Sequence, residues 1–244
     1  MLKTQSVYEA IKLMLHAVIF DFDGVIADAE PVHMRAFQEA LHEEGLSLSK
    51  EEYYDRYLAL DDKTFFATVF RDRGKRFDKA LVKDLMDRKS RYYDRFIREN
   101  IIIFPGVPDF VKNLHKKYAL AIGSGALRHE IEFILEYAGI REEFQVITSA
   151  EDVIKCKPDP EVFIKALNGI NACLASNVKI YPQDCLVIED SIHGIKAAHS
   201  AGMNCLAVAN SYPSHKLSEA DIVVNGLNEV KIEEIEYLFN TDQG

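Results

Sequence analysis

Short apolar runs that alternate with helical patterns constrain this chain more than any other feature of its sequence. The strand-like runs are AVIF (17–20), ALAIG (119–123), FQVIT (144–148), CLVIE (185–189), CLAVA (205–209) and DIVV (221–224). Between the second and third runs, RHEIEFILEYAGI places apolar side chains on one helical face and ends at Gly139, a suitable C-cap. Strands joined through helices run parallel with right-handed crossovers, so the alternation predicts an α/β fold with a doubly wound parallel sheet.

Residues that begin and end helices support this alternation. Asp159 is predicted as the N-cap of the helix DPEVFIKAL, with Pro160 at its first position. Gly202 is predicted to end a helix that begins near Ser191. The segment 168–183 is longer than a simple connection and predicts a surface loop, and residues 1–14 suggest a short helix before the core.

Residues 29–102 interrupt the alternation with successive amphipathic helices, predicted at 31–44, 50–58, 62–73 and 78–99. The chain would therefore consist of an α/β core, residues 1–28 and 103–244, and an inserted helical cap, residues 29–102. A cap inserted directly after the first strand would act as a lid that excludes water, with hinges at both crossings. Its aromatic residues are expected to form the core of the cap rather than a sugar-stacking surface: Tyr53, Tyr54, Tyr57, Phe65 and Phe66.

Composition excludes several classes of partner. The net charge of −10 and the lack of a large basic cluster argue against nucleic acid, although a local cationic pocket can still bind a small phosphate. No apolar run reaches the roughly 18 residues of a membrane span, so a cytoplasmic protein is expected. The four cysteines are far apart and are expected to be structural thiols. The sequence leaves the oligomeric state open, with a monomer favoured.

Polar residues follow three of the strand-like runs. Asp21 and Asp23 follow AVIF, Ser124-Gly125 follows ALAIG, and Glu189-Asp190 closes CLVIE. In extended geometry the side chains of Asp21 and Asp23 share a face, and two carboxylates so close favour a divalent cation. Ligands of open α/β sheets bind beyond the carboxyl ends of strands, where all these residues would lie.

A phosphate site follows from the same residues. The Ser124 hydroxyl and the backbone N–H groups beside Gly125 could cradle a phosphate before a helix. Lys157, in KCKPDPE, is suited to pair with a phosphate and a carboxylate. Each residue also has a structural interpretation: aspartates form turns, Ser124 could cap a helix, and Lys157 could be a solvated charge. Their occurrence together at strand ends favours phosphoryl chemistry.

Four motifs in order carry a resemblance to a known family. The motifs are DFDGVIAD, the serine of IGSGA, the lysine of KPDPE, and IEDSIHG. The chain thus resembles the haloacid dehalogenase-like superfamily, in particular its β-phosphoglucomutase and phosphatase branch, over about residues 15–230. The resemblance implies a Rossmann-like core with a helical cap, and an enzyme that transfers the phosphoryl group of a small phosphorylated metabolite.

The resemblance also implies roles for individual residues. Asp21 would be the nucleophile that forms an aspartyl-phosphate, and Asp23 the acid and base. Ser124, Gly125 and Lys157 would hold the phosphoryl group. Mg²⁺ would be bound by Asp21, the Asp23 carbonyl and Asp190, with Glu189 as a direct ligand or acting through water. Glu189 could instead pair with Lys157 or cap the next helix.

Departures from the family pattern favour a phosphatase over a mutase. Sugar phosphomutases of this branch carry an arginine in the cap loop that grips the second phosphate, whereas the matching stretch here is ALDDK (59–63). Two acids there would repel a second phosphate, a repulsion that Lys63 could partly compensate. Ala29 replaces a hydroxyl residue usual at the hinge, and His33 matches a histidine of the mutase-like cap, although a solvated helix histidine is an equal alternative.

Three other activities are weighed against hydrolysis. A β-phosphoglucomutase-type isomerase is the main alternative. Dehalogenation is disfavoured because it needs no Mg²⁺ and would leave the acidic set unexplained. A phosphoaspartate signalling receiver, the alternative that is not an enzyme, is disfavoured by the cap. The leading prediction is a Mg²⁺-dependent phosphatase.

Overall fold

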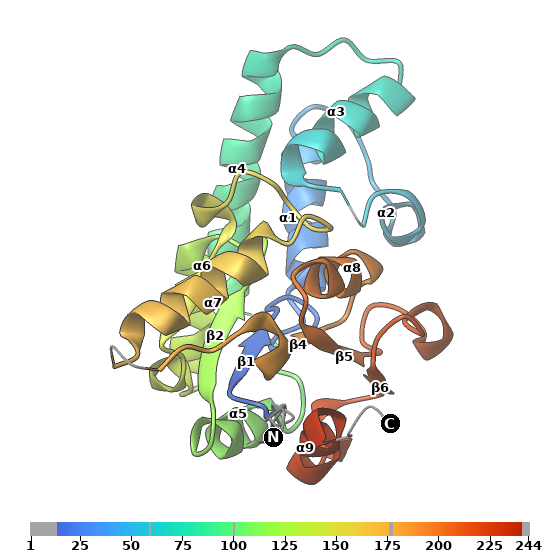
Figure 1. Cartoon of the computed structure of the whole chain (residues 1–244). Helices are drawn as coiled ribbons and strands as arrows, with labels where there is room; N and C mark the ends of the chain where they lie inside the picture. Colours follow the sequence, from blue (N-terminus) through green and yellow to red (C-terminus); the bar gives the residue numbers. More distant parts are fainter. Residues whose placement is uncertain (1–13, 59, 100, 176–177, 241–244) are drawn as a thin grey trace, which may run out of the picture. The chain divides into compact units, whose positions relative to one another are not determined.

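The apolar runs of the sequence form a six-stranded parallel sheet in the computed structural model (Figure 1). The strands are β1 (Ala17–Phe20), β2 (Ala119–Gly123), β3 (Val146–Thr148), β4 (Cys185–Glu189), β5 (Asn204–Val208) and β6 (Ile222–Val224). Their order across the sheet is β3-β2-β1-β4-β5-β6. This confirms the predicted doubly wound sheet, and it places the topological switch point between β1 and β4.

The structure describes residues 14–58, 60–99, 101–175 and 178–240, which group into two units. The cap unit, Asp28–Ile102, contains α1 (Glu30–His42), α2 (Lys50–Arg56), α3 (Asp62–Asp72) and α4 (Lys79–Ile97). The core unit consists of the described residues up to Ala27 and from Ile103 onward. It contains the sheet and the helices α5 (Val107–His115), α6 (Arg128–Tyr137), α7 (Glu161–Cys173), α8 (Ile192–Ser200) and α9 (Ile232–Asn240). Ala27 and Ile103 pair with each other, so the chain leaves and re-enters the core unit at one point.

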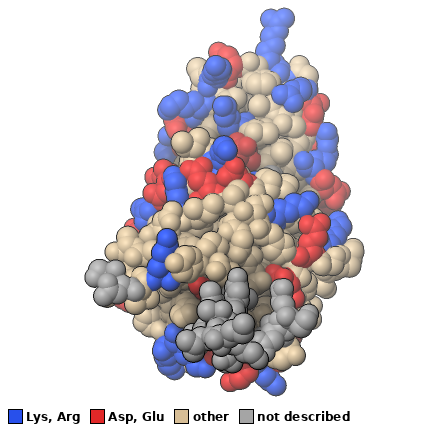
Figure 2. All heavy atoms as spheres, viewed as in Figure 1, with Lys and Arg blue, Asp and Glu red and all other residues tan. Residues whose placement is uncertain are grey.

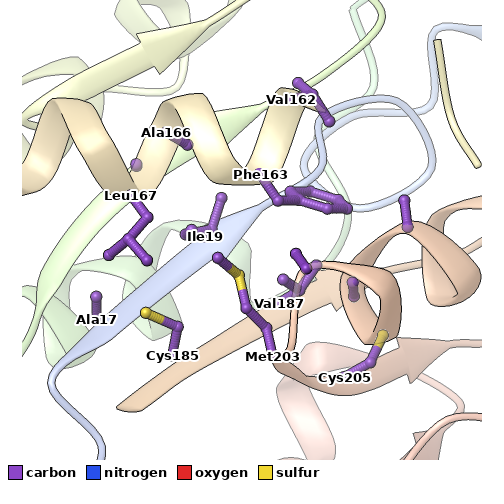
Figure 3. Packing of buried hydrophobic residues seen from close by; sticks show 14 of the residues in the cluster. Ala17, Ile19, Val162, Phe163, Ala166, Leu167, Cys185, Val187, Met203 and Cys205 are labelled. Atoms are coloured by element: carbon purple, nitrogen blue, oxygen red, sulfur yellow. The ribbon is translucent and has the colours of Figure 1, made fainter. Parts of the chain in front are cut away.

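Burial on both faces explains why β1 is a continuous apolar run. All four of its residues are buried. On one face, Ile19 lies in a cluster with Phe163 of α7 and Val187 of β4 (Figure 3). On the other face, the Phe20 ring makes edge contacts with Phe110 of α5 and with Phe144. The central strand is therefore held rigidly where it delivers the residues that follow it.

Side-chain caps fix where three helices of the cap unit begin. The Ser49 hydroxyl accepts from the Glu52 N–H, and the carboxylates of Asp61 and Asp78 accept from N–H groups of α3 and α4. The predicted cap core is confirmed for Tyr53, Tyr57, Phe65 and Phe66, which lie in one buried cluster. The expectation for Tyr54 is wrong, because it lies outside that cluster and is 37% exposed, with its ring edge-on to Tyr53.

Two local predictions need correction. The loop predicted from residue 168 begins later, because α7 continues to Cys173. Gly169 does not break the helix: a Cβ there would lie 2.7 Å from Val146 Cγ1, so the glycine permits close packing of α7 on β3. Helix α7 begins at Glu161 with Pro160 at its cap position, and Asp159 instead accepts a hydrogen bond from the Glu161 N–H.

Three further expectations concern the N-terminal segment, membrane-spanning helices and the charge of the surface. Apart from Met14, the short helix suggested for residues 1–14 lies outside the described residues. Among the described residues no helix is both long and apolar enough to cross a membrane. On the face shown in Figure 2, basic side chains lie among acidic ones, unlike the continuous basic surface that a nucleic-acid backbone requires.

A half-buried acid in the cap unit, Glu30, predicts a pH-dependent stability. Burial raises the pKa of Glu30 to about 7, against the hydrogen bond that the Tyr53 hydroxyl donates to it. Because this pKa is above that of the unfolded chain, the stability that protonated Glu30 contributes is present below about pH 4.5 and is lost by about pH 7. We expect Glu30→Gln to melt at a higher temperature than the wild type at pH 8, with a smaller difference at pH 4.5.

Thermal melts of both proteins across this range measure the effect. Glu99→Gln, an exposed exchange in the same unit, is the control and should leave the pH profile unchanged. A difference between Glu30→Gln and wild type that is the same at both pH values would contradict the assignment.

Candidate active site

The sheet register brings the predicted site residues to one edge. Phe20 of β1 is paired with Ile122 of β2 and with Ile188 of β4, so the residues that follow these three strands lie level with one another. The Asp21 N–H continues the pairing by donating to the Ile188 carbonyl at 2.8 Å. The residues predicted from three separate motifs therefore meet at the carboxyl ends of adjacent strands, beside the switch point.

Lys157 joins two of these motifs. Its ammonium lies 2.7 Å from Asp21 Oδ1 and 2.5 Å from Glu189 Oε1, and it sits 4.8 Å above the Phe163 ring. Burial lowers the pKa of Lys157, but the two carboxylates more than offset this, so its pKa is raised and the side chain is charged. The lysine thus places a fixed positive charge beside Asp21.

The Glu189 carboxylate is completely buried and accepts several hydrogen bonds. Its Oε2 accepts from the N–H groups of Asp190 and Ser191 at 2.8 and 2.9 Å, and from the Ser191 hydroxyl at 2.9 Å. Gly194 must lack a side chain, because a Cβ there would lie 1.8 Å from the Glu189 carboxylate. Of the two alternatives raised from the sequence, pairing with Lys157 is present, whereas α8 is capped by Ser191, whose hydroxyl accepts from the Gly194 N–H.

Three buried carboxylates form a set that fits a divalent cation. Asp21, Glu189 and Asp190 each offer an oxygen within 4.8 Å of the others. Burial raises the pKa of Asp21 to about 6, against the effect of Lys157, and burial followed by the charges of Glu189 and Asp21 raises the pKa of Asp190 well above its usual value. Fully ionised, the set and Lys157 would carry a net charge of about −2, which a divalent oxygen-liganded cation balances.

Asp23 and Gly24 form the turn that follows Asp21. The Gly24 φ of +79° is in the left-handed region, and a Cβ there would lie 1.8 Å from Asp190 Oδ2. Glycine is therefore required both by the turn and by the approach of Asp190. Asp23 is half-buried and is not part of the three-carboxylate group.

Ser124 and Gly125 follow β2. Ser124 is 2% exposed, and its hydroxyl accepts from the Ala126 N–H at 3.1 Å, a local turn contact rather than the helix cap considered from the sequence, because α6 begins at Arg128 with Leu127 at its cap position. A Cβ at Gly125 would meet open space, so a ligand could approach the backbone here. These two residues lie in the strand-end position predicted for a phosphate cradle, and their phosphate contacts stay a prediction.

The sequence analysis missed two residues of this region. Asn210 Nδ2 donates to the Gly24 carbonyl at 2.7 Å, and the Ser211 hydroxyl donates to Asp190 Oδ2. Both residues come just after the end of β5. The other site residues were predicted because they follow strands, so the same rule could have identified Asn210 and Ser211.

The cap residues discussed from the sequence have partners inside the cap unit. Asp61 caps α3, and Asp62 pairs with the buried Lys89 at 3.1 Å, so both acids are engaged. Lys89 also lies 2.9 Å from His33 Nδ1, and burial followed by the Lys89 charge lowers the pKa of His33. His33 is thus only partly exposed, and its ring has partners in the cap unit rather than solvent alone. Ala59 lies outside the described residues.

Comparisons with known proteins identify relatives. A family model for haloacid dehalogenase-like hydrolases matches residues 18–208. The chain is 29% identical over 226 residues, 92% of its length, to the chloroplastic 5-amino-6-(5-phospho-D-ribitylamino)uracil phosphatase of Arabidopsis thaliana, but spans only 58% of that protein. It is 28% identical over 232 residues to the beta-phosphoglucomutase of Bacillus subtilis (strain 168), which covers 90% of this chain and 93% of that protein.

A solved structure agrees with these matches. The beta-phosphoglucomutase of Clostridium difficile superposes with a TM-score of 0.79 at 26% identity, over 93% of this chain and 98% of that one. These relatives confirm the predicted class, an enzyme of phosphoryl transfer on small phosphorylated metabolites. The chain belongs to the family of haloacid dehalogenase-like hydrolases.

Proposed function

We propose that this chain is a Mg²⁺-dependent phosphatase that hydrolyses a small phosphomonoester through an aspartyl-phosphate on Asp21. One observation supports this most: the buried Asp21 carboxylate follows the central strand, contacts the Lys157 ammonium, and lies within 4.8 Å of oxygens of two further acids. A carboxylate held in this way has the surroundings of a nucleophile in phosphoryl transfer.

Two steps complete the proposed reaction. An Asp21 oxygen attacks phosphorus as the bond to the leaving alcohol oxygen breaks, and Asp23 donates its proton to that oxygen. Asp23 then takes a proton from a water molecule whose oxygen attacks the same phosphorus, which releases Asp21 and inorganic phosphate. Lys157, the Ser124 hydroxyl and the Gly125 N–H are assigned to the phosphoryl oxygens, where they stabilise the transition-state charge.

The donor set supports Mg²⁺ as the cation. We assign the Asp21 and Asp190 carboxylates and the Asp23 carbonyl as its protein ligands. Bound there, Mg²⁺ would supply positive charge to the phosphoryl oxygens and reduce their repulsion by Asp21. Because both Glu189 oxygens already hold partners, we assign Glu189 to positioning Lys157 and the start of α8 rather than to direct ligation.

Hydrolysis is favoured over mutase activity by the cap loop. The position where mutases of this branch carry an arginine falls in a stretch whose two acids are engaged by α3 and by Lys89, and Lys63 is its only cation. The engaged acids supply no positive charge for a second phosphate. From the sequence, Asp61 and Asp62 were expected to repel a second phosphate. Because the start of α3 and Lys89 partly neutralise these two carboxylates, the loop instead offers little attraction for a second phosphate.

A panel of phosphorylated metabolites tests the proposal. The panel includes 5-amino-6-(5-phospho-ribitylamino)uracil, sugar phosphates, and β-glucose 1-phosphate with and without glucose 1,6-bisphosphate. We expect free phosphate from at least one monophosphate, dependent on Mg²⁺ and abolished by chelation. Formation of glucose 6-phosphate without free phosphate would instead identify a mutase.

Substitution of Asp23 tests the acid and base role. Asp23→Asn cannot donate or accept the proton, so kcat should fall by about a hundredfold or more. The fall should be smaller for substrates with good leaving groups, such as an aryl phosphate, because their departure needs less protonation. Comparison of kcat for an alkyl and an aryl phosphate measures this difference. Turnover near that of the wild type on both substrates would refute the assignment.

A further inference from the structure

The loop after β5 contacts the proposed cation site at two points. Asn210 Nδ2 donates to the carbonyl of Gly24 at 2.7 Å, which holds the turn that carries Asp21 and Asp23. The adjacent Ser211 hydroxyl donates to Asp190 Oδ2. Two consecutive residues of one loop therefore hold the residues that follow β1 and those that follow β4.

Close packing shows how tightly these groups meet. A Cβ on Gly24 would lie 1.8 Å from Asp190 Oδ2 and 2.9 Å from the Ser211 hydroxyl oxygen. Asp190 is 5% exposed, so its carboxylate has little room to turn, whereas Ser211 is exposed and reaches it from the surface. The Ser211 hydroxyl therefore restrains one oxygen of the Asp190 carboxylate.

We propose that Ser211 is a positioning residue for the cation site, which holds the Asp190 carboxylate in the orientation that Mg²⁺ requires. This inference rests on the proposed function. Groups that orient metal ligands raise metal affinity by restricting the ligand to its binding orientation, and their removal typically weakens metal binding 10- to 100-fold. Ser211 does not touch the substrate or the phosphoryl group in this proposal.

Titration calorimetry of Mg²⁺ into the cation-free full chain tests the proposal. We expect Ser211→Ala to weaken Mg²⁺ binding by about 10- to 100-fold, and Ser211→Thr, which keeps the hydroxyl, to stay close to the wild type. Ser214→Ala, an exposed serine of the same loop, is the matched control and should bind Mg²⁺ like the wild type. At saturating Mg²⁺ the kcat of Ser211→Ala should recover.

The outcomes separate this inference from the proposed function. Wild-type affinity in Ser211→Ala would overturn the role of Ser211 and leave the phosphatase proposal intact. A fall in affinity that Ser211→Thr does not restore, together with a lower melting temperature of the cation-free protein, would overturn it in favour of a purely structural role. A wild-type chain that binds no Mg²⁺ would overturn the proposed function itself.

Discussion

Replacement of Asp21 by asparagine is expected to lower phosphatase activity at least about a thousandfold, because an amide cannot form the aspartyl-phosphate. Asparagine has nearly the same shape as aspartate and can keep the contact with Lys157. The loss should therefore appear in kcat at every substrate concentration. Rapid quenching with labelled substrate should detect a phosphoenzyme in the wild type and none in the variant.

Stability separates this loss from misfolding. Burial raises the pKa of Asp21 to about 6, so the ionised carboxylate destabilises the cation-free fold as the pH rises from about 3.8 through 6. In the absence of Mg²⁺ at pH 7.5, Asp21→Asn should melt at the same temperature as the wild type or higher. The exposed exchange Asp109→Asn is the control for activity and should leave it unchanged. Residual turnover above about a tenth of the wild type would rule out Asp21 as the nucleophile.

The sheet and its site could be predicted from the sequence because both follow from the same physical rule. Buried parallel strands are continuous apolar runs, and three of the six runs match their strands residue for residue. Polar residues directly after such runs must lie at the carboxyl edge of the sheet, which is why the position of Asp21 and Asp190 at this edge could be predicted without any structure.

The sequence could not supply contacts that depend on the path of a loop. Lys157 comes from a connection between β3 and α7, and nothing in its spacing shows that it reaches both Asp21 and Glu189. Ser211 is similar, because its hydrogen bond to Asp190 depends on the turn after β5. The contact between His33 and Lys89 was also missed, since the two residues lie 56 positions apart on different helices.

Removal of the Lys157 ammonium is expected to destabilise the cation-free protein by about 3 to 5 kcal/mol, because it leaves two buried carboxylates without their shared counter-charge. Lys157→Met keeps an apolar side chain of similar length and removes the ammonium that lies over the Phe163 ring, so the lost charge is the main change. Denaturant unfolding at pH 8 measures the effect. Lys155→Met is the matched control: it lies two residues away, 71% exposed, and its pair with Asp159 should contribute at most about 1 kcal/mol.

The effect of Lys157→Met should depend on pH in a way that identifies its cause. The pKa of Asp21 is about 6 in the presence of Lys157 and should be higher without it, because the lysine lowers it. Below pH 6 the carboxyl takes up a proton and no longer needs the counter-charge, so the destabilisation at pH 5 should be smaller than at pH 8. A loss of the same size at both pH values would mean that packing of the lysine stem, rather than its charge, stabilises this edge of the sheet.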